Sequence, residues 1–287
     1  MKIQKPYIYR RDAEDAEKAH SILSSPRSLR LCGKNVFLAF LLILIPAIAT
    51  AATTQPTALS DKSTVNEVLD ALDARGKSIQ DFTASVKLSE SDNSAGDSSS
   101  NSGTIILQRK GPGDARIRVA FSKRQEGNEI KDYDHRYTLD NGMLVERDYK
   151  RKQETRTQVL KPGQKLDLFK LGEGPFPLPL GQKKEDVLKL FDVAKIAPAA
   201  GDPPGTVHLQ LTPKKGTSFA KQFLTIDIWV DCANAMPRRI QTVDINNTST
   251  RTTDLTNVKI NAEVSDKDFV EEPLPPVWDV IEGPYQN

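Results

Sequence analysis

The stretch KDYDHRYTLDNGMLVERDY, residues 131–149, has two strand-length segments on either side of an Asn-Gly pair. Asn-Gly favours a two-residue turn whose twist matches an antiparallel hairpin. In the first segment Tyr133, His135 and Tyr137 alternate with polar residues, which is typical of a strand with one buried face. The stretch therefore predicts a β-hairpin with His135 on the same face as the two tyrosines, and we interpret it as an ordinary strand histidine.

The same two-residue period continues on both sides of this hairpin. Residues 82–88 alternate between apolar and polar side chains, whereas the polar, low-complexity segment 91–102 predicts a long mobile hairpin loop. Consecutive short strands with hairpin turns form a meander, which closes or nearly closes into a barrel. Besides residues 82–88, the predicted strands are 103–109, 115–122, 131–139, 143–149, 153–160, 193–199, 205–212, 222–231, 237–245 and 249–260.

Helical periods interrupt this pattern. Thr64 and Glu67 have the spacing of a capping box, and an apolar stripe follows, so the sequence predicts a helix over 64–79. Residues 183–192 predict a second, shorter helix, and 166–171 a further helical turn. Both longer helices have an apolar face and are natural lids for a barrel with a cavity.

Prolines mark two further segments. Residues 175–181 hold three prolines, which excludes regular helix or central strand there. The tail 269–281 is also proline-rich, and we expect it to pack irregularly with Trp278 as an anchor.

The N-terminal region has the order of an export signal. A basic stretch, 27–34, precedes an apolar run, 36–48, and small residues follow at Ala49–Ala52. This order is typical of a signal peptide, and the run is shorter than the roughly 20 residues of a membrane-spanning helix. We expect cleavage near Ala49–Ala52 and a periplasmic location. An uncleaved anchor is the alternative, and the long leader leaves the true start codon open.

The expected domain organisation is a signal peptide with a long n-region over 1–52, a linker over 53–62 and one domain over 63–287. From Thr53 onward the chain has 32 basic and 34 acidic residues, so it has no surplus of positive charge. Binding to nucleic acid therefore has no electrostatic support.

Residues with catalytic or metal-binding potential are scarce after the leader. His135 and His208 have no partner at metal-ligand spacing, and no hydrolase, Walker or dinucleotide motif is present. Cys232 is left without a second cysteine for a disulfide. We therefore expect no enzyme, metal or cofactor. The pair Glu271-Glu272 is interpreted as solvated, and the basic cluster at 150–152 as a solvated hairpin tip or a contact with a membrane surface.

Six segments, spread over residues 64–281, resemble in order the LolA-type family of lipoprotein carriers. In that family an Arg directly before a Pro holds the lid shut, whereas here Gly111 has that place and Arg109 and Lys110 precede it. The segments are SIQDFTASVKLSE at 78–90, RKGPGDARIRV at 109–119, DNGMLVERDY at 140–149, the strands at 211–214 and 222–231, the closing hairpin at 244–261 and the end at 269–281.

The resemblance implies a mainly β (α+β) fold, an open, unclosed antiparallel β-barrel of about eleven strands with a helical lid over an apolar cavity. It also implies a periplasmic carrier of the acyl chains of lipoproteins or lipids, with an inner-membrane releasing complex and an outer-membrane acceptor as partners. A lipid-sensing module of the same fold is the alternative. The side chains expected to line the cavity are Phe82, Val86, Leu88, Ile117, Val119, Phe121, Leu188, Phe191, Ile226 and Ile228.

Overall fold

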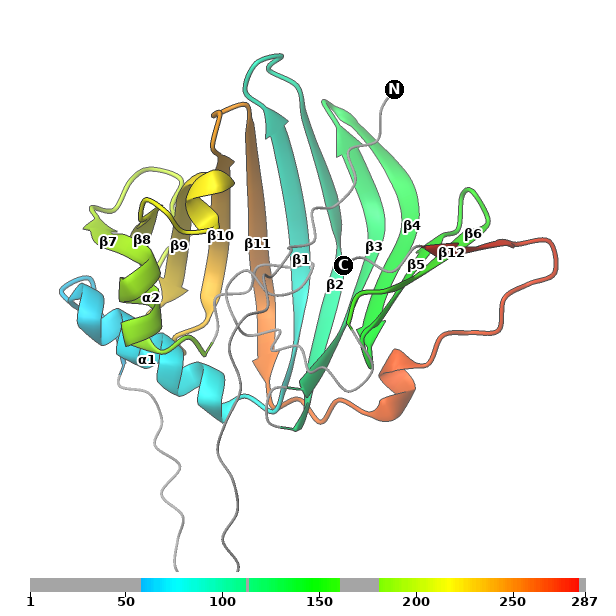
Figure 1. The fold of residues 1–287 in the computed structure, drawn as a ribbon, viewed down its shortest axis with the longest axis horizontal. Helices are drawn as coiled ribbons and strands as arrows, with labels where there is room; N and C mark the ends of the chain where they lie inside the picture. The colour runs from blue at the N-terminus through cyan, green and yellow to red at the C-terminus, as the bar shows by residue number, and fades with distance from the viewer. Residues whose placement is uncertain (1–57, 112–113, 161–180, 284–287) are drawn as a thin grey trace, which may run out of the picture. The chain divides into compact units, whose positions relative to one another are not determined.

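The computed structural model of the 287-residue chain describes residues 58–111, 114–160 and 181–283 (Figure 1). The predicted signal peptide, half of the linker, the helical turn at 166–171 and nearly all of the proline-rich segment 175–181 lie outside the described residues. In the segment predicted as a linker, Leu59 is buried and its N–H donates to the Cys232 carbonyl at 2.9 Å.

Twelve strands form one sheet in the order β12-β6-β5-β4-β3-β2-β1-β11-β10-β9-β8-β7. The chain passes outward from β1 to β6, restarts at the opposite edge with β7, and returns to pair β11 with β1 in the middle. The edge strands β12 and β7 are not hydrogen-bonded to each other, so the barrel is open. The strands are β1 Asp81–Asp92, β2 Ser98–Gly111, β3 Asp114–Glu126, β4 Glu129–Asp140, β5 Met143–Asp148, β6 Gln153–Gln158, β7 Phe191–Ile196, β8 Thr206–Pro213, β9 Phe223–Asp231, β10 Pro237–Asp244, β11 Ser249–Ile260 and β12 Asp279–Gly283.

Strands β1–β11 confirm the predicted antiparallel meander. Two expectations were wrong. The segment 91–102 is not a long loop, because β1 and β2 extend as paired polar strands and leave only residues 93–97 between them. The tail is not wholly irregular either, since β12 pairs in parallel with β6. Neither feature has an apolar period, so the alternation of side chains did not reveal them.

Two backbone features set the register in the middle of the sheet. Asn141 and Gly142 have φ of 49° and 75°, and this turn places His135 opposite Asp148 and Tyr137 opposite Glu146. At Gly103 a Cβ would lie 1.9 Å from the Ala120 carbonyl oxygen, next to a register shift between β2 and β3. Only glycine allows this close approach of the two strands.

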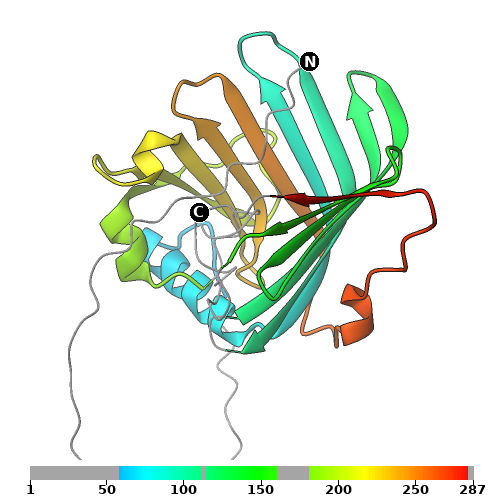
Figure 2. The same ribbon diagram turned by 45° about the vertical axis from the view of Figure 1, so that its right-hand side comes forward.

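Helices α1 (Val65–Ser78) and α2 (Lys184–Leu190) lie on the same side of the sheet, within its curve (Figure 2). Thr64 and Glu67 form the predicted capping box of α1. The short 3-10 helices are η1 (Phe219–Lys221) and η2 (Asp266–Phe269), and η2 lies on the outer side of the sheet. Among the helices of the described residues, none is long and apolar enough to cross a membrane.

Candidate functional site

The concave face of the sheet is largely aliphatic. Strand register places Phe82, Leu107 and Ile117 in one row across β1, β2 and β3, and each is at most 1% exposed. On the other half of the sheet, Leu209 and Ile228 are opposite each other on β8 and β9. Helix α1 adds Val68, Leu69 and Leu72 to the same core, so the core is continuous from the sheet to the helices.

The structure brings the ten predicted lining residues to this face. Leu88 and Leu188 are half-buried and pack against the core. The other eight are buried within it, namely Phe82, Val86, Ile117, Val119, Phe121, Phe191, Ile226 and Ile228. A ligand can therefore reach them only if an element packed on them moves, and their role in binding stays a prediction.

Polar contacts attach the helices at a few points. The Arg109 guanidinium donates to the Gly76 carbonyl at 2.7 Å and to the Ile79 carbonyl at 3.2 Å, both at the C-terminal end of α1. Arg75 donates to the Asn234 carbonyl at 2.6 Å, and burial lowers the pKa of Arg75. An arginine thus holds the end of α1 although Gly111 has the position that the resemblance assigns to an arginine.

The two helices are also joined to each other. Lys184 of α2 lies 2.7 Å from an Asp70 carboxylate oxygen of α1, and this contact raises the pKa of the lysine. Asp70 is exposed and Lys184 is half-buried, so solvent screens the pair and it contributes little to stability. Helices α1 and α2, which we call the cover, are therefore attached mainly by apolar packing and a few hydrogen bonds. If the helices separated, neither charge of this pair would be left buried without a partner.

A polar cluster interrupts the apolar face on β4 and β5. His135 is 6% exposed, and its Nε2 lies 2.8 Å from a Glu146 carboxylate oxygen. Its Nδ1 lies 3.1 Å from the Tyr133 hydroxyl and 3.9 Å from Asp148. The imidazole is stacked between Tyr133 and Tyr137, with ring centroids 5.2 and 4.9 Å away.

The environment of this cluster favours neutral phenols. Burial raises the pKa of Tyr133, and burial together with the nearby Glu146 raises that of Tyr137 well above the ordinary tyrosine value. The prediction that His135 shares a face with the two tyrosines is confirmed. Its two acidic neighbours were missed, although the Asn-Gly turn already implies a register in which position 135 faces 148 and 137 faces 146.

No group of three or more His, Cys, Asp or Glu side chains suited to a metal ion occurs within 58–111, 114–160 and 181–283. A depression of about 300 Å³ lies near β7 and β8, lined among others by Lys195, His208 and Cys232. None of the ten predicted lining residues borders it.

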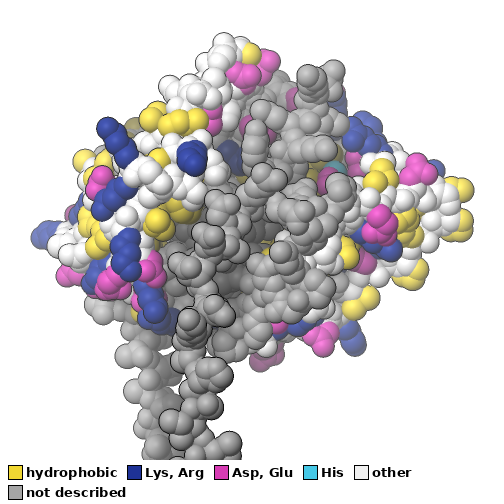
Figure 3. Space-filling view, viewed as in Figure 1, with side chains coloured by type: hydrophobic (Ala, Val, Ile, Leu, Met, Phe, Trp, Pro, Cys, Tyr) yellow, Lys and Arg dark blue, Asp and Glu magenta, His cyan; other side chains and the backbone are white. Residues whose placement is uncertain are grey.

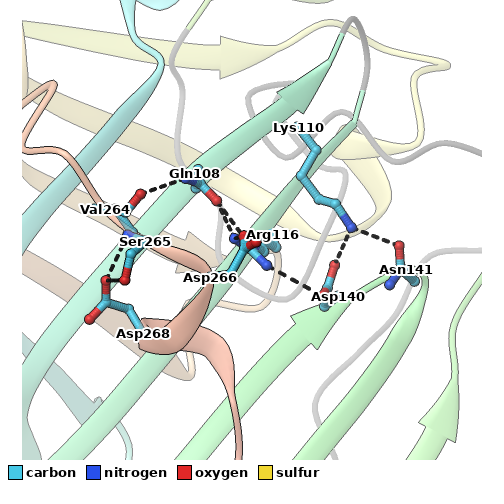
Figure 4. Close-up of polar contacts among 9 residues, drawn as sticks. All are labelled: Gln108, Lys110, Arg116, Asp140, Asn141, Val264, Ser265, Asp266 and Asp268. Carbon is cyan, nitrogen blue, oxygen red and sulfur yellow. Dashed lines mark hydrogen bonds and ion pairs between the residues drawn. The ribbon is translucent and has the colours of Figure 1, made fainter.

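The C-terminal segment 261–283, which we call the strap, crosses the convex face of β2–β5 and ends as β12 beside β6. Figure 4 shows its first part. The Gln108 amide donates to the Val264 carbonyl at 2.7 Å. The Arg116 guanidinium binds Gln108 and Asp266 and lies 4.2 Å from the Phe269 ring centroid. The strap is therefore fixed by a buried arginine at the point where η2 begins.

Further along, the strap meets a second buried arginine. Arg147 of β5 donates to Glu154 at 2.7 Å and to the Glu272 carbonyl at 2.8 Å, and it lies 3.3 Å from Glu271. Although burial opposes its charge, the hydrogen bond with Glu154 helps to raise the pKa of Arg147. Glu271 also accepts a hydrogen bond from Thr138. The interpretation of Glu271 as a solvated residue was wrong.

No protein-family model and no curated protein sequence matches the chain. Three solved structures illustrate what the fold is similar to. An uncharacterized conserved protein from Thermus thermophilus is 11% identical, over 77% of this chain and 100% of that chain, with a TM-score of 0.44. LprF from Mycobacterium bovis is 14% identical, over 69% and 93%, with a TM-score of 0.40. A LolA superfamily protein from Nitrosomonas europaea is 11% identical, over 73% and 98%, with a TM-score of 0.30.

At such identities a likeness concerns the fold alone. The open, unclosed antiparallel barrel predicted from the sequence is confirmed by the observed architecture, an open sheet whose eleven antiparallel strands carry two helices on the concave face. The twelfth, parallel strand is an addition to that prediction.

Proposed function

We propose that this chain binds the acyl chains of lipids or lipoproteins on its concave face and carries them through the periplasm. The proposal depends on one observation: α1 and α2 pack on a continuous aliphatic face of the open sheet, and polar contacts hold these helices at only a few points. A cover of this kind can separate from the sheet and expose apolar surface to a ligand.

The energetics support binding followed by release. Burial of one methylene group contributes about 0.8 kcal/mol, so a long acyl chain on this face is strongly bound. When the ligand leaves, the helices cover the same surface again, which offsets part of that free energy. A carrier needs this balance. If nothing covered the apolar surface after the ligand left, the full cost of exposing that surface to water would oppose release.

Arg109 has a defined part in this proposal. Its two hydrogen bonds to backbone carbonyls hold the C-terminal end of α1 against β2. Hydrogen bonds from a charged donor contribute about 1.5–3 kcal/mol each when formed. We propose that this contact sets the closed position of the cover. Export is supported separately by the basic, apolar and small segments of residues 27–52.

The direct test is to purify the protein from the periplasm of a producing bacterium and to identify bound lipid by mass spectrometry. We expect acylated species at near-stoichiometric amounts. The protein should also release lipoproteins from inner-membrane vesicles, whereas a lipid-sensing module would bind lipid without releasing lipoprotein. Protein that contains no lipid and does not bind a fluorescent fatty acid would contradict acyl binding.

A matched pair of variants tests the cover. Arg109→Met removes both hydrogen bonds to α1, so the exchange rate of a bound fluorescent fatty acid should rise by at least about tenfold. Arg124→Met removes an arginine that is paired with the exposed Glu126, and it should leave exchange unchanged. Equal exchange rates in both variants would show that the end of α1 does not control access.

A further inference from the structure

Apolar side chains are exposed at the end of the sheet where β12 begins. Val277 is 82% exposed, and Val280 and Ile281 are 46% and 44% exposed. Yellow side chains are visible at the corresponding right-hand end of the space-filling view (Figure 3). Val277 has a φ of 80°, which is an outlier for a β-branched residue. The backbone is thus held in a strained conformation while an apolar side chain points into solvent, an arrangement that suggests a function.

The same end of the sheet carries a basic cluster. The hairpin between β5 and β6 ends in Lys150, Arg151 and Lys152, all exposed. The Asp279 N–H donates to the Lys152 carbonyl at 3.0 Å, which places the start of β12 directly beside these cations.

An aromatic side chain joins the two segments. The Trp278 ring packs edge-on against Tyr149, with centroids 5.0 Å apart. We call residues 149–152 together with 277–281 the tip. It combines cations, a tryptophan and exposed aliphatic side chains. This combination is typical of surfaces that lie in the interface of a membrane, where cations meet lipid phosphates and apolar groups enter the acyl region.

We propose that the tip docks the protein on an anionic phospholipid bilayer. Attraction between Lys150 and Lys152 and the negative surface brings the tip to the bilayer, and Val277 enters it with Trp278 at the headgroup level. The acidic groups of the tip region do not prevent this. Glu282 lies 3.8 Å from Arg156 and Asp148 lies 3.5 Å from Arg151, so each has a cation of its own. Asp279 is the remaining exposed acid of the tip.

Docking goes beyond acyl binding and does not require it. A variant that binds no acyl chain should still dock, and a protein that carries lipid without docking would leave the proposed function intact. The two proposals therefore fail separately.

Trp278 provides a local readout in the full chain. The chain has two tryptophans, and the other, Trp229, is 5% exposed. We would titrate the protein with vesicles of phosphatidylcholine and phosphatidylglycerol that carry bromine on their acyl chains, which quench a tryptophan inserted among them. We expect quenching and a blue shift with the anionic vesicles and neither with pure phosphatidylcholine. Trp278→Phe should abolish both signals, which assigns them to the tip rather than to the N-terminal apolar segment.

Matched variants separate the tip from the general surface. Lys150→Ala with Lys152→Ala should lower the affinity for the anionic vesicles, as measured by quenching, about fivefold for each cation removed. Lys215→Ala with Lys221→Ala removes two exposed lysines beside η1 and should have no effect. Val277→Ser should weaken binding about tenfold, whereas Leu224→Ser, at a side chain that is 44% exposed on β9, should not.

Three outcomes would overturn the proposal. The first is a Trp278 signal that anionic vesicles leave unchanged. The second is an equal loss of the signal in the two double lysine variants, at 150 and 152 and at 215 and 221. The third is self-association of the wild-type protein that Val277→Ser abolishes, since the tip would then be an interface between two copies of the chain.

Discussion

The helices on the inner side of the sheet and the strap on its outer side are attached by different interactions. Under the helices, the inner side of β8–β10 is aliphatic, and Leu209, Ile228 and Ile240 are at most 2% exposed. Under the strap, the outer side of β3–β6 buries charged groups, among them Arg116, which is 6% exposed, and Glu154, which is 1% exposed. One cover is thus attached mainly by apolar packing and the other by ion pairs.

This difference indicates which cover can move. Separating apolar surfaces costs free energy in proportion to area, and an incoming acyl chain returns that free energy. Separating a buried ion pair leaves charges without partners, and no acyl chain compensates for them. We therefore expect ligand-dependent motion at α1 and α2 and a strap that stays in place. Hydrogen exchange with and without a fatty acid would check this contrast.

The largest effect should come from Arg147→Leu. It leaves the buried Glu154 with Arg156 as its remaining partner and also removes the contact with Glu271, so unfolding free energy should fall by about 4 kcal/mol. Urea denaturation measures the loss. The double variant Arg147→Leu, Glu154→Leu should lose much less, because no buried charge is then unpaired. A double variant as unstable as the single one would show that the loss does not come from an unpaired Glu154.

A smaller loss is expected from Ile228→Ala on the inner side of the sheet. Ile228 is 2% exposed in the core under the helices, and its truncation should cost about 3 kcal/mol in a urea titration. Val280→Ala, at an exposed side chain of β12, should change stability by less than about 0.5 kcal/mol. An equal loss at both positions would contradict the assignment of the core to the concave face.

Next in size is the cap of α1. Thr64→Ala removes the side-chain acceptor for the Glu67 N–H, which is 3.3 Å away, and should cost about 1 kcal/mol. If α1 is the movable cover, the same variant should raise the rate of fatty-acid exchange. Thr212→Ala, at an exposed position of β8, serves as the control. A loss of stability without faster exchange would place the opening motion elsewhere than at α1.

The smallest effect is a dependence on pH. Hydrogen bonds from the Thr64 backbone and side chain lower the pKa of Glu67 below the ordinary glutamate value. A carboxylate whose pKa is lowered by folding stabilises the protein above its unfolded pKa, and this contribution disappears as the pH falls through the folded pKa. Glu67→Gln should therefore be less stable than wild type at pH 7, and urea midpoints should show a smaller difference below pH 4. If the difference in stability between wild type and Glu67→Gln were the same at both pH values, titration of Glu67 would not be its cause.

Local pattern was sufficient for much of the fold. The alternation at 82–88, the Asn-Gly turn and the capping box at Thr64 correctly predicted β1, the β4–β5 hairpin and α1. These features depend on residues within one or two turns of each other. Even the neighbours of His135 were within reach, because a two-residue turn determines which positions face each other across a hairpin.

Other features depended on tertiary structure. The pairing of β1 with β11 and of β12 with β6 joins segments separated by more than 100 residues, and neither partner has a pattern that selects the other. The same holds for the strap on Arg116 and Arg147, and for the reach of Arg109 to α1. Period and turn chemistry determine a strand and its nearest neighbour, whereas the choice of distant partners depends on which surfaces and charges remain unpaired once the strands have formed.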